Sequence, residues 1–282
     1  MTETKDREIF SQIPMRTWRW LGVNESEWPE HVAENAKLDV LRAGIGETKE
    51  YVQVCREAGF QEVHVRVEDG AELHLVDVQL VPLDAPHAGR VHVHVGKEAK
   101  FSYTGIEAGA AESAAELLVE LEGADAKADV AALYFTDGTR NVDMNYMIRQ
   151  AGRRTEADMQ IRGALLGESR KTFRGTLDFL EGAKGSVGRE NEEVVVLSPH
   201  VRNRSVPLML SHEDDVDGHH AVSIGKMDEG KLFYLMSRGL DLAEAQRLVV
   251  EASFQPVLAR VPDAALREEI EALIKERLES GR

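Results

Sequence analysis

The chain has 282 residues, of which 43% are hydrophobic and 30% are charged, and its formal net charge is −16. This length and composition are typical of a folded globular protein with a sizeable core, and they argue against a disordered chain or a membrane protein. The acidity opposes binding to nucleic acid phosphates and to anionic lipid, because both depend on a basic surface. Proteins, metal ions and other cations are therefore the expected partners.

The sequence carries no sign of membrane insertion or export. No run approaches the roughly 20 apolar residues that span a bilayer, and the first ten residues are polar and charged, unlike a signal peptide. We therefore expect a cytoplasmic protein. Cys55 is the only cysteine, which excludes an internal disulfide and a cluster held by thiolates of one subunit alone.

Residues 1–60 form the first predicted region, which we expect to be helical. From residue 29 to residue 59, helix-forming residues carry apolar side chains at helical spacing, interrupted by Gly44 and Gly46. Two short helices are the prediction. Cys55 falls on the apolar stripe of the second one, where a free cysteine is typically a small buried hydrophobic residue.

Residues 61–227 form the second predicted region, a core of strands. Apolar and polar residues alternate at 63–67 and 91–95, which indicates half-exposed strands. Gly152, Gly167 and Gly182 open successive turns 15 residues apart, and Gly96 and Gly123 extend the repeat less regularly. This period favours the stacked strands of a parallel β-helix over the alternative, an antiparallel sandwich. Within residues 142–198 we expect one continuous core that contains Met144, Ile161, Leu165, Phe173, Leu177 and Phe179.

Residues 228–282 form the third predicted region, which is again helical. The pattern predicts helices at 232–235, 243–254 and 264–278, with Asp241 as an N-cap and Pro262 near a helix start. The predicted fold class is therefore mainly β, with a parallel β-helix core between helical N- and C-terminal regions.

Motifs for nucleotide hydrolysis and common enzyme chemistry are incomplete. Residues 223–227 contain Gly-Lys but lack the first glycine of a P-loop and the Ser or Thr that follows its lysine. The sequence also has no GxSxG elbow, HExxH pair or kinase-like set. We expect a chain that binds no nucleotide and is not an enzyme.

Two groups of histidines are candidate metal ligands. Residues 212–220 hold three histidines and four carboxylates, a set that suits ferrous iron or zinc, although a solvated acidic turn explains it equally simply. An EF-hand does not fit, because Glu213 and Ile224 stand at its first and last ligand positions. His92 and His94 share one face of a predicted strand. They can bind a metal together, but the simpler interpretation is contact with cross-strand neighbours.

Three segments resemble one known family. Residues 215–228 (DVDGHHAVSIGKMD) and 232–240 (LFYLMSRGL) resemble the C-terminal signature of SufB and SufD proteins, a DV-x-C-x-HGAT turn followed by a YL-x-SRG helix. Residues 163–175 (GALLGESRKTFRG) resemble the family's strand–turn–strand segment, KGVL-x-G-x-S-x-x-x-F-x-G. The similarity extends from about residue 142 to residue 254.

The resemblance implies a right-handed parallel β-helix and a scaffold role in a SUF-type iron–sulfur cluster assembly complex. The implied partners are a SufC-like ABC ATPase, in which ATP is hydrolysed, and a second SufB/SufD-type protomer in a homodimer or heterodimer. The ATPase would dock on the C-terminal helical region, at residues that include Phe233, Tyr234, Leu235, Arg238 and Gly239.

The family's cluster histidine corresponds to His220. The resemblance therefore implies that iron or a transient iron–sulfur cluster binds at His220, His219, Asp217, Asp215 and Glu213. Gly218 stands where the family has a cysteine, and Ala221 where it has Gly or Glu. A cluster at this turn consequently needs thiolates from another molecule, or nitrogen and oxygen ligands.

Two other functions stay open from the sequence. One is a purely structural, SufD-like partner without a metal, which differs from the scaffold only at His219 and His220. The other is a β-helical carbohydrate-binding or carbohydrate-active protein, which needs an aromatic-lined groove with paired carboxylates. Aromatic residues make up only 6% of this chain.

Overall fold

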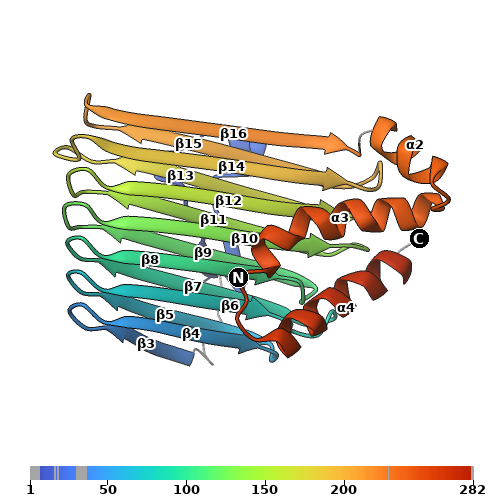
Figure 1. Ribbon diagram of the computed structural model, residues 1–282, viewed down its shortest axis with the longest axis horizontal. Helices are drawn as coiled ribbons and strands as arrows, with labels where there is room; N and C mark the ends of the chain where they lie inside the picture. The colour runs from blue at the N-terminus through green and yellow to red at the C-terminus, as the bar shows by residue number, and fades with distance from the viewer. Residues whose placement is uncertain (1–6, 16, 18, 30–36, 228, 281–282) are drawn as a thin grey trace, which may run out of the picture.

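The computed structural model describes residues 7–15, 17, 19–29, 37–227 and 229–280. Over these residues, two parallel seven-stranded sheets face each other and three α-helices follow at the C-terminal end (Figure 1). Successive strands alternate between the two sheets, so that each pair of strands makes one rung of a parallel β-helix. The predicted β-helix core and C-terminal helices are confirmed.

We name the sheets by their strand numbers. The odd sheet contains β3 (Lys37–Ala43), β5 (Gly59–Val67), β7 (Pro86–Val95), β9 (Glu112–Leu121), β11 (Asn141–Gln150), β13 (Arg170–Phe179) and β15 (Arg202–Ser211). The even sheet contains β4 (Thr48–Cys55), β6 (Glu72–Gln79), β8 (Lys100–Glu107), β10 (Lys127–Thr136), β12 (Glu156–Leu165), β14 (Ser186–Val196) and β16 (Val216–Lys226).

The described residues before β3 pack on the outside of the odd sheet. They contain β1 (Arg7–Phe10), a short 3-10 helix, η1 (Arg19–Leu21), and β2 (Ser26–Pro29), and β1 pairs with β2 antiparallel. The Phe10 ring meets the Phe60 ring edge-on, with centroids 5.5 Å apart, in a small cluster with Ala88 and Ala114. This contact lies near the beginnings of β5, β7 and β9.

The main core lies between the two sheets. It contains all six residues predicted for it, which are at most 1% exposed: Met144, Ile161, Leu165, Phe173, Leu177 and Phe179. The strands of residues 142–198 pair in parallel with neighbours one rung away, as the repeat predicts. The prediction of one continuous core is confirmed.

The glycine repeat marks turns that stack on one another. A Cβ on Gly152 would collide with the backbone of Gly123, and a Cβ on Gly123 with the backbone of Gly96 and Lys97. Only glycine allows such a close approach of consecutive rungs. The spacing of 15 residues corresponds to half a rung, because each rung has two strands and a turn follows each strand.

The predicted N-terminal helical region is wrong. Residues 37–43 and 48–55 are strands β3 and β4, which pair in parallel with β5 and β6, so the β-helix begins well before residue 61. Tyr51 packs against the interior core, whereas Val54 packs against the helical layer outside. Apolar residues on both faces of a strand hide the alternation and imitate helical spacing. Residues 30–36 of the predicted helix lie outside the described residues.

The C-terminal helices are α2 (Glu229–Ser237), α3 (Leu242–Leu258) and α4 (Ala264–Ser280). Asp241 caps α3 as predicted, in a capping box with Glu244. Helices α3 and α4 lie across the outer face of the even sheet (Figure 1), where Phe254 and Ile270 join a second core with Phe135. None of the described helices is long and apolar enough to cross a membrane.

Candidate functional site at the open end of the solenoid

The predicted metal ligands lie at one end of the β-helix, which we call the open end. It is formed by β15 and β16, the last strands of the odd and even sheets. Side chains alternate along a strand. A side chain at Gly218 would point at Met209 and at Phe179 of the interior core, so the even-numbered residues of β16 face inward.

The structure divides the five predicted ligands between two faces and a turn. His219 and Asp217 share the outer face of β16, with Nε2 and Oδ1 2.8 Å apart, and each side chain is 62% exposed. The carboxylate of Glu213 accepts hydrogen bonds from the backbone amides of Asp214 at 3.1 Å and of Gly182 at 3.2 Å. Asp215 lies in the same turn.

His220 faces inward at the open end and is exposed, because β16 is the last described strand of its sheet. Since His219 points to the opposite face, the five residues do not converge on one position within a single chain.

A buried carboxyl group lies next to His220. Glu190 of β14 is in register with His220 and is only 2% exposed. Neither of its carboxylate oxygens has a hydrogen-bond partner among the described residues. Burial raises the pKa of Glu190 to about 8, and the neighbouring Glu192 raises it further than Lys171 lowers it. Glu190 is therefore neutral at pH 7 and can release a proton when a cation approaches.

A polar cluster continues from Glu190 into the interior. Lys171 forms an ion pair with Glu192, and both side chains are fully buried. The Lys171 ammonium also donates hydrogen bonds to Asn203 at 3.0 Å and to Ser205 at 2.8 Å, both on β15. Burial lowers the pKa of Lys171, and the Glu192 carboxylate opposes this shift. This cluster was not predicted, although Lys171 and Glu192 occupy inward positions of their strands.

The only cysteine lies at the other end of the β-helix. Cys55 is on β4 and His220 on β16, the two edge strands of the even sheet, which six strand spacings separate by roughly 29 Å. Cys55 Sγ lies 3.6 Å from His87 Nδ1. Burial raises the pKa of the Cys55 thiol and lowers that of His87 to about 4. The thiol is thus not activated, and it cannot share a cluster with His220 of the same chain.

The predicted partner-binding residues lie on and just after α2, a helix without buried residues. Phe233 is 74% exposed and Tyr234 is 56% exposed. The Arg238 guanidinium lies over the Tyr234 ring, 5.2 Å from its centroid. Leu235 is half-buried, and Gly239 ends the helix with φ +99°. We define the α2 patch by its exposed apolar residues: Phe233, Tyr234, Met236, Leu242 and Leu248.

Another group of possible metal ligands lies on the odd sheet. Among the described residues, His92, His94 and Glu120 have ligand atoms that all lie within 4.8 Å of one another. The shared face of His92 and His94 was predicted. Glu120 was missed, although it lies 28 residues after His92, close to one rung of the repeat.

Comparisons with known proteins point to one family. Residues 31–253 match the family described as SUF system FeS cluster assembly, SufBD core domain. The iron-sulfur cluster assembly SufBD family protein Mb1497 of Mycobacterium bovis is 28% identical over 221 residues, which cover 76% of this chain and 56% of that protein. The family protein ML0594 of Mycobacterium leprae is 26% identical over 220 residues, which cover 75% of this chain and 56% of that protein.

A shorter match is to the iron-sulfur cluster assembly protein SufD of Bacillus subtilis, which is 28% identical over 141 residues, 50% of this chain and 32% of that protein. The chain spans about half the length of the two mycobacterial relatives and a third of the Bacillus protein. The family match covers most of the chain, and its resemblance to SufB and SufD motifs is confirmed. The chain belongs to the SufBD family of iron–sulfur cluster assembly proteins.

Proposed function

We propose that the chain is a non-catalytic scaffold subunit of a SUF-type iron–sulfur cluster assembly complex and works with a SufC-like ABC ATPase. Membership of the SufBD family supports the assembly role. The observation that carries the ATPase partnership is the α2 patch: Phe233, Tyr234 and Met236 are exposed on α2, a helix without buried residues, and Leu242 and Leu248 are exposed on α3. Exposed large apolar side chains that are close together in the chain are typical of a protein–protein interface.

A second SufB/SufD-type protomer is the proposed partner at the open end. The outer edges of β15 and β16 have no neighbouring strand among the described residues, and such edges are usually covered in soluble proteins. Ile224 on the inward face of β16 is 49% exposed. A protomer that covers this end would enclose His220 and the polar cluster around Glu190.

Iron or a transient cluster is the proposed cargo at His220. A neutral imidazole suits ferrous iron, and Glu190 adds a carboxyl group on the adjacent strand. Because Cys55 is far away, thiolates would come from the partner protomer or from a small thiol. The carbohydrate alternative has less support, since the strongly exposed aromatic residues of the described chain lie on η1 and α2, not along the solenoid: Trp20, Phe233 and Tyr234.

The ATPase partnership is tested at the α2 patch. The double variant Phe233→Asp and Tyr234→Asp should no longer co-purify with a coexpressed SufC-like ATPase, because two charges would have to be desolvated in the contact. A tagged chain and the amount of ATPase recovered with it give the measurement. Val40→Asp is a matched control, since Val40 is 73% exposed on β3 at the other end of the solenoid. Unchanged recovery with the double variant would rule out docking at this patch.

The proposed cargo site is tested by His220→Ala. The anaerobic complex of this variant should bind less iron and assemble less cluster than wild type, as measured by iron and sulfide analysis, because an inward ligand is lost. His219→Ala is the control on the outer face of the same strand and should have the smaller effect. A thermal melt checks the fold of both variants. If His220→Ala matches wild type, the chain is a structural partner that does not touch the metal.

A further inference from the structure

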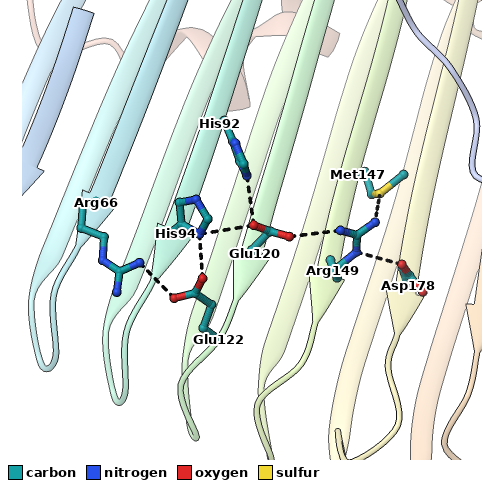
Figure 2. A network of polar contacts seen from close by, with 8 residues as sticks. All are labelled: Arg66, His92, His94, Glu120, Glu122, Met147, Arg149 and Asp178. Carbon is teal, nitrogen blue, oxygen red and sulfur yellow. Dashed lines mark hydrogen bonds and ion pairs between the residues drawn. The ribbon is translucent and has the colours of Figure 1, made fainter.

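A polar network crosses the outer face of the odd sheet, from β5 to β13 (Figure 2). His94 of β7 is in register with Glu120 of β9, and His92 lies on the same face two residues earlier. The two imidazole rings have centroids 4.5 Å apart. Both rings approach the same carboxylate oxygen, Glu120 Oε2, which lies 3.0 Å from His92 Nε2 and 3.2 Å from His94 Nδ1.

We propose that His92 Nε2, His94 Nδ1 and Glu120 Oε2 bind one divalent first-row transition metal ion, Fe²⁺ or Zn²⁺. Ligands at 2.0–2.1 Å from a tetrahedral ion are about 3.3 Å from one another. The two nitrogen–oxygen distances, 3.0 Å and 3.2 Å, are close to this value, and all three ligand atoms lie within 4.8 Å of one another. The site lies on the opposite sheet from His220, and the proposal does not depend on the scaffold function.

The ligand set indicates which ions bind and how. Two histidines and one carboxylate are typical of ferrous iron and zinc sites that keep open coordination positions. Mg²⁺ and Ca²⁺ prefer oxygen ligands throughout and are not expected here. The side chains of His92, His94 and Glu120 are 30%, 33% and 21% exposed, so the site is ordered by its neighbours and still reachable from solvent. We expect an exchangeable ion in place of a permanent structural one.

Arg149 holds the carboxylate in the orientation that the ion needs. It lies in register with Glu120 on β11, with Nη1 3.1 Å from Oε1 and Nε 3.1 Å from Asp178 Oδ2 (Figure 2). Oε1 is therefore occupied and Oε2 is left facing the imidazoles. Partial burial raises the pKa of Glu120, but the hydrogen bonds from His92 and Arg149 outweigh it and the pKa lies below its usual range. Such orienting partners around a metal ligand typically strengthen its site.

Glu122 provides the nearest further carboxylate. Its Oε1 lies 2.7 Å from His94 Nδ1, and its Oε2 lies 3.0 Å from Arg66 Nη1. When an ion takes His94 Nδ1, Glu122 can stay on Arg66 or become a fourth ligand. With neutral imidazoles, the carboxylates of Glu120, Glu122 and Asp178 outnumber the guanidinium groups of Arg66 and Arg149. This local negative charge attracts a cation.

Metal titration of the chain, after a chelator has removed any bound ion, tests the proposal. Zn²⁺ is titrated in air, Fe²⁺ anaerobically, and Co²⁺ serves as a probe whose visible spectrum reports the coordination. His92→Ala and His94→Ala should each bind one equivalent fewer than wild type. Arg149→Gln should keep the site but weaken it about 10- to 100-fold.

Two matched controls accompany these variants. His64→Ala removes an imidazole on the neighbouring strand, 6.0 Å from the His92 ring and paired with Glu62 at 2.8 Å, and should bind like wild type. His220→Ala should still bind the ion at His92, His94 and Glu120. This result would distinguish that site from the proposed cargo site at the open end.

The rise in melting temperature on adding the ion tests binding even in a variant that is less stable than wild type. An ion that binds only the folded chain raises the melting temperature, so Zn²⁺ should raise it by a smaller amount in His94→Ala than in wild type. The proposal is overturned if wild type and the His92 and His94 variants bind the same number of ions. The network is then an ion-pair ladder only. A Co²⁺ spectrum that is identical in wild type and His94→Ala would have the same meaning.

Discussion

At the scale of single residues, Glu190 is the clearest departure from an apolar interior. A buried carboxylate without partners is costly, so the group stays protonated instead. Its pKa of about 8 compares with an ordinary value of 4.5. The folded chain therefore keeps a proton that the unfolded chain loses as the pH rises above about 4.5. Glu190 consequently lowers the free energy of unfolding between about pH 5 and pH 8.

Glu190→Gln should remove this pH-dependent penalty. We expect it to raise the free energy of unfolding at pH 8 by on the order of 2–4 kcal/mol and to change it little at pH 5. Urea denaturation at the two pH values measures the difference. Glu193→Gln, on the outer face of the same strand and paired with Arg162, should give no such gain. Equal pH profiles for wild type and Glu190→Gln would contradict the assignment.

The sequence predicts only part of the chemistry at this scale. His92 and His94 are recognisable as neighbours on one strand face because alternation is a local property. Glu120 joins them through the register of β7 and β9, which the lengths of the intervening turns determine. The pattern within one strand does not contain that information, so the third ligand was missed.

At the scale of elements, alternation fails where a strand is covered on both faces or carries exposed apolar residues on its outer face. The side chains of β4 contact the interior core on one face and the helical layer on the other. On β3, Leu38 and Val40 are 60% and 73% exposed in place of the polar residues expected there. Both strands were therefore predicted as helices. The C-terminal helices were predicted correctly because their caps and amphipathic faces are local signals.

One buried ion pair anchors α4 to the even sheet. Arg277 is 4% exposed and pairs with Asp137 just after β10. Its guanidinium also donates hydrogen bonds to the backbone carbonyls of Ala108 and Phe135. These contacts hold the last helix across the ends of two strands.

Arg277→Ala should lower the free energy of unfolding by about 1–3 kcal/mol, because the buried hydrogen bonds to the carbonyls of Ala108 and Phe135 are lost, although Asp137 keeps an ion pair with Arg140. Chemical denaturation of the purified variant measures this loss. Arg56→Ala is the control, because Arg56 also forms an ion pair with α4, at Glu269. The side chains of Arg56 and Glu269 are 52% and 45% exposed. We expect a loss of at most about 1 kcal/mol for that control. Similar losses for the two variants would show that burial does not determine the strength of the α4 anchor.

At the scale of the whole molecule, the repeat was predictable and the arrangement of the site was not. The glycine spacing indicates stacked rungs because the backbones of successive turns approach so closely that each turn needs a glycine at the same place. The candidate site at residues 213–220 looks like one cluster in the sequence. In the structure, His219 and His220 lie on opposite faces of β16 because side chains alternate along a strand. The carboxylate of Glu213 accepts a hydrogen bond from the backbone amide of Gly182, in the turn before β14. Proximity in the sequence is therefore not convergence in space.

The open end has a further consequence for how this molecule folds. In a solenoid each rung is stabilised by the rungs on either side, and the terminal rung has only one such neighbour. Most of β15 is accordingly only half-buried, whereas most of β13, one rung inside, is fully buried. A partner that stacks on β15 and β16 would supply the missing neighbour and act as one more rung. Ordering of the terminal strands and formation of the complex would then be a single event, completed between two chains.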